Sequence, residues 1–134
     1  MIEAVNEPFM VGGPSNMDDF TKQYYFDAYG TIRYDASSSQ SRYVATFSDG
    51  FEGLSYWRGF MSEPAQSAVA FDTHSYTVFS PQEVGQSQQD RLNQVCSKRS
   101  DLRNNMQYYW TIVGEWTSAT TGEWGLCSLR DSKC

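Results

Sequence analysis

Four short, continuous apolar runs recur along the chain, separated by segments too long for hairpin turns. They end near Glu7, Phe47, Phe71 and Glu115. Parallel strands need crossover connections of about a dozen residues or more, usually helical. Parallel strands are also buried on both faces, so their sequences are continuously apolar rather than alternating. The spacing therefore predicts consecutive strand and helix units, with strands over residues 2–8, 43–47, 68–71 and 110–116.

The first connecting segment carries a clear helix pattern. Residues 16–34 place apolar side chains three or four positions apart, and Asp18 and Asp19 come early, where the helix dipole favours negative charge. Gly30 weakens the end of this helix by about 1 kcal/mol relative to alanine. A helix is expected here, with Gly30 as one candidate for its end.

Two later segments carry weaker helix signals. A short helix is expected from Gly53 to about residue 61, because the Pro64 that follows disfavours helix in the residue before it. Ser80 starts the next helix as its cap, with proline in the first turn and Glu83 at the capping-box position. That helix is expected to reach about Cys96, and the charged residues 98–105 then lead into the last strand.

Two glutamates, Glu7 and Glu115, close the first and last apolar runs. Functional side chains lie at the carboxyl ends of the strands in α/β barrels, so these two are expected at one end of the sheet. A pair of carboxyl groups is what glycoside hydrolysis needs, because one protonates the leaving oxygen while the other attacks, or directs water at, the anomeric carbon. Residues 72–79, at the end of the third run, deliver further polar side chains to the same end.

Charge and composition exclude several other classes of function. The formal net charge of −6 argues against nucleic acid and anionic membranes as partners. No run of about 20 apolar residues is present to span a bilayer. One histidine and three scattered cysteines show no zinc-ligand spacing, so neither a metal nor another cofactor is expected. The aromatic content of 16% suits both a core and surfaces on which sugars stack.

Four motifs, in order and at approximate spacing, resemble the fungal exo-1,3-β-glucanases of glycoside hydrolase family 5. They are Asn6-Glu7-Pro8, Ser48-Asp49-Gly50-Phe51, Asp72-Thr73-His74-Ser75-Tyr76-Thr77-Val78-Phe79 and Gly114-Glu115-Trp116. The resemblance covers residues 1–121 and leaves 122–134 as an unaligned tail. It implies an α/β fold of the (β/α)8 TIM barrel type. It also implies retaining cleavage of 1,3-β-glucan from the non-reducing end by a two-glutamate double displacement.

The resemblance also implies a role for each site residue. Glu7 becomes the acid/base and Glu115 the nucleophile. The substrate-binding residues are Asn6, expected on the sugar 2-hydroxyl, His74 and Tyr76 beside the nucleophile, and Phe51 and Phe79 flanking the cleft entrance. Trp57 is expected in the core rather than at the site, and Asp72 either supports the barrel through hydrogen bonds or takes part in the site.

The length of 134 residues is short for such a barrel, which takes roughly 250. We therefore expect a partial barrel, an arc of about four parallel strands corresponding to strands four to seven, with the missing strands supplied by a parent chain. The alternative function is a truncated, catalytically inactive fragment that binds glucan weakly at most. The resemblance implies a secreted or cell-wall protein, although no signal peptide precedes the first strand.

Overall fold

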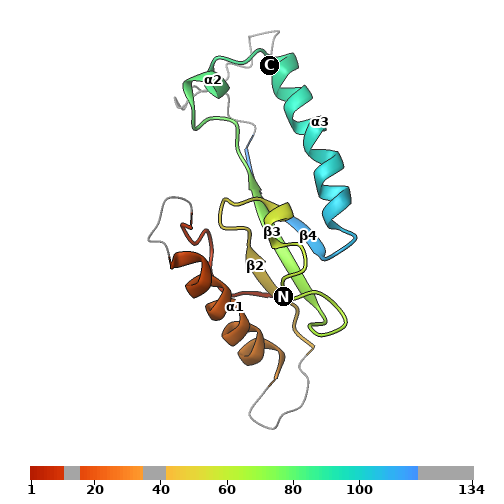
Figure 1. Cartoon of the computed structure of the whole chain (residues 1–134). Coiled ribbons are helices and arrows are strands. Elements are labelled where there is room, and N and C mark those ends of the chain that lie inside the picture. The colour runs from red at the N-terminus through yellow and green to blue at the C-terminus, as the bar shows by residue number, and fades with distance from the viewer. Residues whose placement is uncertain (11–15, 35–41, 118–134) are drawn as a thin grey trace.

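The computed structural model of the chain describes residues 1–10, 16–34 and 42–117. Its centre is one four-stranded sheet in which every neighbouring pair is parallel and the spatial order is β1-β2-β3-β4 (Figure 1). The strands are β1 (Ile2–Glu3), β2 (Ala45–Ser48), β3 (Val69–Ser75) and β4 (Trp110–Trp116). Helices follow β1 and β3, and a 3-10 turn follows β2, which confirms the predicted partial (β/α)8 arc of parallel strands.

Helix α1 (Met17–Arg33) follows β1 and packs beside β2 (Figure 1). It passes Gly30 without a break, so the possible end at Gly30 is wrong. Burial explains the continuation, because Tyr29 and Arg33 flank the glycine and are both buried. The anchoring of the last turn to the rest of the protein outweighs the small intrinsic penalty of one glycine.

The hydrophobic core lies between one face of the sheet and the segments that cover it. We call this the helix face of the sheet, and it carries Ala45 and Phe47 of β2 with Val69 and Phe71 of β3. The other members of the core are Met10, Tyr25, Tyr29, Leu54, Trp57, Met61 and Tyr109. Trp57 is completely buried, as predicted for a core residue.

The segment after β2 forms less helix than the sequence indicates. Only a single 3-10 turn, η1 (Leu54–Trp57), is present where residues 53–61 were expected to be helical. Gly53 and Gly59 have φ angles of 79° and 85°, outside the helical region, so they end the regular structure on both sides. The turn still carries Leu54 and Trp57 into the core.

The connection from β3 to β4 contains two helices instead of one. Helix α2 (Pro81–Val84) has the predicted capping box between Ser80 and Glu83 but ends after a single turn. Helix α3 (Gln88–Asn105) starts at a second cap, Ser87, whose hydroxyl accepts from the Asp90 N–H. The helix therefore includes residues 98–105, which were expected to be a non-helical lead into β4.

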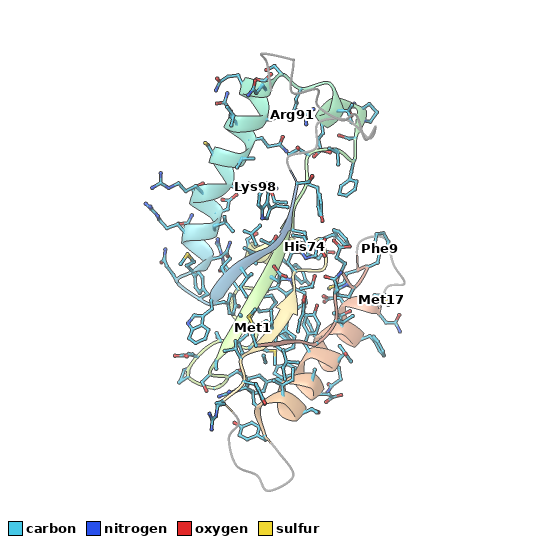
Figure 2. All side chains as sticks on the ribbon, turned by 180° about the vertical axis from the view of Figure 1, so that it is seen from behind. Met1, Phe9, Met17, His74, Arg91 and Lys98 are labelled. Carbon is cyan, nitrogen blue, oxygen red and sulfur yellow. The ribbon has the colours of Figure 1, made fainter. Side chains whose placement is uncertain are left out.

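Long basic side chains of α3 form hydrogen bonds with the end of β3 and with the residues that follow it, as far as α2 (Figure 2). Lys98 Nζ donates to Ser75 Oγ over 2.9 Å. Arg91 donates to the Thr77 carbonyl over 2.9 Å and to the Val84 carbonyl over 2.8 Å.

The described helices include none that is long and apolar enough to cross a membrane. The predicted tail, 122–134, lies outside the described residues.

Candidate active site

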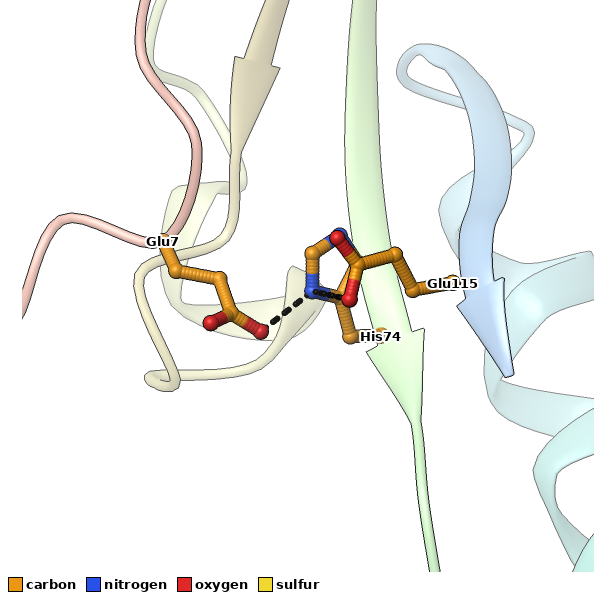
Figure 3. Close-up of side chains that lie close together, drawn as sticks. All are labelled: Glu7, His74 and Glu115. Atoms are coloured by element: carbon orange, nitrogen blue, oxygen red, sulfur yellow. Dashed lines mark hydrogen bonds and ion pairs between the residues drawn. The ribbon is translucent and has the colours of Figure 1, made fainter. Parts of the chain in front are cut away.

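Glu7, His74 and Glu115 meet at the carboxyl end of the sheet, although they are far apart in the sequence (Figure 3). His74 Nδ1 lies 2.5 Å from Glu7 Oε1 and 3.4 Å from Glu115 Oε2. One imidazole nitrogen of His74 and one carboxyl oxygen of each glutamate all lie within 4.8 Å of one another. The two glutamates predicted to work together therefore face one another across a single imidazole.

Each of these three side chains comes from a different strand or strand end. Glu7 follows β1 and has a φ angle of 44°, which is uncommon for a residue other than glycine. β1 itself is only Ile2–Glu3, so the expectation that the strand extends to Glu7 is wrong. His74 lies near the end of β3 and Glu115 near the end of β4, where the register pairs them directly.

Tyr76 orients Glu115 as expected for a residue beside the second carboxylate. Its hydroxyl donates to Glu115 Oε2 over 2.5 Å. This hydrogen bond raises the pKa of Tyr76, so the hydroxyl stays a donor at neutral pH. The bond holds one of the two Glu115 oxygens and leaves the side chain 41% exposed to solvent.

The aromatic and amide residues expected to bind sugar are exposed, and one of them, Phe79, contacts the tyrosine that binds Glu115. Phe51 contacts Phe9 edge to face with ring centres 6.2 Å apart, and Phe79 contacts Tyr76 with ring centres 5.3 Å apart. Both predicted rings are exposed, and no ring contact joins them to one another within the described part of the chain. Asn6 is exposed beside Glu7.

Two residues of the site were not assigned from the sequence. Gly114 interrupts the pairing of β3 with β4, and its N–H donates to Asp72 Oδ1 over 2.6 Å. A lone glycine inside a strand pattern is a known signal for a bulge, so the sequence did contain a hint of this feature. Asp72, for which support and function had stayed equal alternatives, makes a supporting hydrogen bond.

The charges around His74 favour its protonated form. Burial lowers the pKa of His74, but the hydrogen bond with Glu7 and the negative charges of Glu115 and Asp72 outweigh it. The net result is a pKa above the ordinary value of 6.5. The carboxylate of Glu3 is also near enough to interact electrostatically with His74. His74 therefore carries a proton through more of the neutral range than a solvent-exposed histidine.

This shift predicts how stability depends on pH. Because the folded-state pKa of His74 lies above the unfolded value, protonated His74 stabilises the fold fully below about pH 6.5, and the benefit disappears as pH rises through the folded pKa. His74 is the single histidine of the chain, so its ring proton signals are unambiguous in nuclear magnetic resonance. We expect a titration midpoint above 6.5 that falls in Glu7→Gln. A midpoint below 6.5 in the unsubstituted chain would contradict this.

The three residues offer ligand atoms of the types that a metal ion takes, but the closest pair among them, His74 and Glu7, has the spacing of a shared proton. Two ligands of one tetrahedral zinc ion, each about 2.0 to 2.1 Å from the metal, lie roughly 3.3 Å apart. His74 Nδ1 and Glu7 Oε1 are 2.5 Å apart, a hydrogen-bond distance. The geometry is that of acid/base groups in contact.

A cavity of about 500 Å³ lies between α3, η1 and the ends of β3 and β4. His74 and Trp116 are among its lining residues, but Glu7 and Glu115 are not. The two carboxylates lie outside this cavity, at the strand ends, where both are partly accessible to solvent.

Comparison with known proteins finds extensive similarity to one group of fungal enzymes. A glucan 1,3-β-glucosidase of Blumeria graminis is 36% identical over 121 residues, which is 90% of this chain and 26% of that protein. A probable glucan 1,3-β-glucosidase A of Aspergillus niger is 37% identical, with the same two shares. The glucan 1,3-β-glucosidase I/II of Saccharomyces cerevisiae is 31% identical over 90% of this chain and 25% of its own. No family model matches the sequence.

The chain spans about a quarter of the length of the curated relatives it matches. The similarity therefore concerns one segment of those proteins. A match over 121 of 134 residues necessarily includes β3 and β4, on which His74 and Glu115 lie.

Proposed function

We propose that this chain is the catalytic segment of a glycoside hydrolase that cleaves 1,3-β-glucan, with Glu7 as acid/base and Glu115 as nucleophile. The observation that carries the proposal is the meeting of the two carboxyl groups, whose oxygens lie within 4.8 Å of one another. Retaining glycosidases hold their carboxyl groups about 5 to 5.5 Å apart, whereas inverting ones leave room for a water molecule at about 6.5 to 9.5 Å. The names of the relatives support the same substrate.

The reaction proceeds in two displacements. Glu115 attacks the anomeric carbon while Glu7 donates its proton to the glycosidic oxygen, so the carbon–oxygen bond breaks and a glycosyl ester forms on Glu115. Glu7, now a carboxylate, takes a proton from water as that water attacks the same carbon. The ester bond breaks, Glu115 returns to its carboxylate form, and the sugar leaves with its original anomeric configuration.

The neighbouring side chains support these two roles. The Tyr76 hydroxyl stabilises the carboxylate of Glu115, which has to be ionised to attack. His74 Nδ1 shares a hydrogen bond with Glu7, which has to give up and regain a proton in each cycle. Asn6 is assigned to the 2-hydroxyl of the sugar. Phe51 and Phe79 supply exposed rings on which a glucan chain stacks.

The family assignment to glycoside hydrolase family 5, cleavage from the non-reducing end and a secreted or cell-wall location are parts of the same proposal. They rest on the four sequence motifs and on the similarity to the fungal enzymes. The remaining strands of a closed eight-stranded barrel would come from a parent chain. A β-glucan polysaccharide or oligosaccharide is the proposed partner.

A chimeric enzyme tests this function. The matched 121-residue segment of the Blumeria graminis relative is replaced by the corresponding part of this chain, and glucose release from a linear 1,3-β-glucan is measured. We expect the chimera to release glucose, and the isolated 134-residue chain to release little or none because its site lacks the remaining strands. A chimera with the thermal stability of the parent enzyme but without activity would support the alternative, an inactive segment that binds glucan weakly.

A further inference from the structure

Asp72 lies between the two halves of the site and contacts both. It belongs to β3, and its side chain is 9% exposed. Oδ1 accepts a hydrogen bond from the Gly114 N–H over 2.6 Å. Oδ2 lies 3.6 Å from His74 Nε2, which is within ion-pair distance. One buried carboxylate therefore touches the backbone beside Glu115 and the imidazole that binds Glu7.

The contact with Gly114 belongs to a bulge in β4. Thr73 pairs with Val113, but the next residue, His74, pairs with Glu115, so Gly114 is an extra residue without a partner. Side chains alternate between the two faces of a strand. If Gly114 paired with His74 in a regular register, Glu115 would pair with Ser75 and face away from His74. The bulge is what brings Glu115 to the same face as His74.

The position of Asp72 also explains why the extra residue is glycine. A Cβ atom added to Gly114 would lie 2.0 Å from Asp72 Oδ2 and 2.6 Å from its carboxyl carbon. No side chain fits there while the carboxylate accepts the Gly114 N–H. Asp72 and Gly114 therefore form one unit, in which a side chain of β3 takes the place of the missing backbone partner of β4.

The second contact concerns the proton on His74. Nε2 is buried and has no hydrogen-bond partner among the described residues, and Asp72 Oδ2 is the carboxylate that faces it. A nitrogen that faces a carboxylate keeps its hydrogen, because a bare lone pair there would be repelled. Nδ1 faces the carboxyl group of Glu7 at 2.5 Å, so the two nitrogens compete for the hydrogen of neutral His74. When Glu7 carries a proton, as its proposed acid role requires, Nδ1 accepts from the Glu7 hydroxyl and the hydrogen of His74 stays on Nε2, opposite Asp72.

We propose that Asp72 is a positioning residue that sets both halves of the site. Through the Gly114 bulge it aims Glu115, and through Nε2 it selects the His74 tautomer that serves Glu7. The importance of this arrangement for catalysis rests on the proposed glycosidase function, but the arrangement itself can be tested without activity.

The two contacts are separable by substitution. In Asp72→Asn the carboxamide oxygen still accepts the Gly114 N–H, and its NH₂ group then faces His74 Nε2 as a donor. In Asp72→Ala both contacts are lost. Asp49→Asn is the matched control, because Asp49 is an equally buried acid at the end of β2 that binds Phe51 N and Thr73 Oγ1 and not His74.

Nitrogen-15 magnetic resonance of the 134-residue chain reads both contacts directly. We expect neutral His74 to carry its hydrogen on Nε2, and the Gly114 amide to exchange slowly with solvent. Asp72→Asn should move the hydrogen to Nδ1 while the Gly114 amide stays protected. Asp72→Ala should speed Gly114 exchange by about ten-fold or more, and Asp49→Asn should change neither signal.

Several results would overturn the proposal. They are an Nδ1–H tautomer in the unsubstituted chain, an unchanged tautomer in Asp72→Asn, or random-coil behaviour of Gly114 before any substitution. In the active chimera, Asp72→Asn should lower kcat with little change in KM, and an equal loss in Asp49→Asn would count against it. A chimera without activity would remove the glycosidase proposal while leaving the magnetic resonance result standing, so the two failures are distinguishable.

Discussion

Glu115→Gln in the chimera should reduce kcat for glucose release by about a thousand-fold or more. Glutamine has nearly the same shape and keeps an oxygen to accept the Tyr76 hydroxyl, but its amide cannot form the glycosyl ester. Losses of at least this size are found when the nucleophile of a covalent mechanism is removed. The measurement is steady-state kinetics on a linear 1,3-β-glucan, with thermal unfolding to verify that the variant is folded.

Glu52→Gln is the control for this substitution. Glu52 is an exposed glutamate in the turn after β2. The substitution removes the same single negative charge at a position outside the cluster of Glu7, His74 and Glu115. We expect its activity to stay within about two-fold of the unsubstituted chimera, because surface substitutions have small effects. Full activity in Glu115→Gln would remove Glu115 as the nucleophile.

The two glutamates can also be told apart by adding azide to their alanine variants. With an aryl glucoside that has a good leaving group, azide in Glu115→Ala attacks from the face that the glutamate vacated and gives the inverted glucosyl azide. In Glu7→Ala the glycosyl ester still forms, and azide gives the retained product. Exchanged outcomes would mean that the two roles are assigned the wrong way round.

Trp57→Ala should lower the free energy of unfolding of the chain by about 3 to 5 kcal/mol. Trp57 is completely buried, and its ring lies 5.1 to 5.3 Å from those of four neighbours, Tyr25, Tyr56, Phe60 and Phe71. Its indole N–H also donates to the Asp49 carbonyl over 2.9 Å. Truncation leaves a large cavity between α1, η1 and the helix face of the sheet, and an unpaired carbonyl next to the site.

Urea unfolding followed by circular dichroism measures this effect. Trp110→Ala is the matched control, because Trp110 is 62% exposed at the start of β4 and should contribute less than about 1 kcal/mol. Total stabilities of small domains are about 5 to 15 kcal/mol, so Trp57→Ala should leave a substantial part of the chain unfolded. Equal losses in the two variants would show that the aromatic cluster around Trp57 is not the core that holds the sheet.

The elements that the sequence predicted well are those encoded by neighbouring residues. Continuous apolar runs predicted the positions of all four strands, and the length of the connections predicted that the strands are parallel. Spacings of three and four residues located α1, and Ser80 with Glu83 located the start of α2. The ends of elements were less predictable, because the split between α2 and α3 depends on a second cap at Ser87 that competes with continuing the first helix.

By itself, the sequence indicated that two glutamates lie at or after the ends of two parallel strands, and that a histidine and a tyrosine lie at the end of a third. Which of these side chains touch was decided only by the tertiary structure, because contact depends on register and on local breaks in the pleat. His74 was expected beside Glu115, yet its shortest contact is with Glu7 across the sheet. Glu115 reaches that face because Gly114 is an extra residue in β4, between the residues that pair with Thr73 and His74, and its N–H donates to the Asp72 side chain. A shift of one residue reverses the face of a strand side chain, and here the shift coincides with a hydrogen bond between residues 42 positions apart in the sequence.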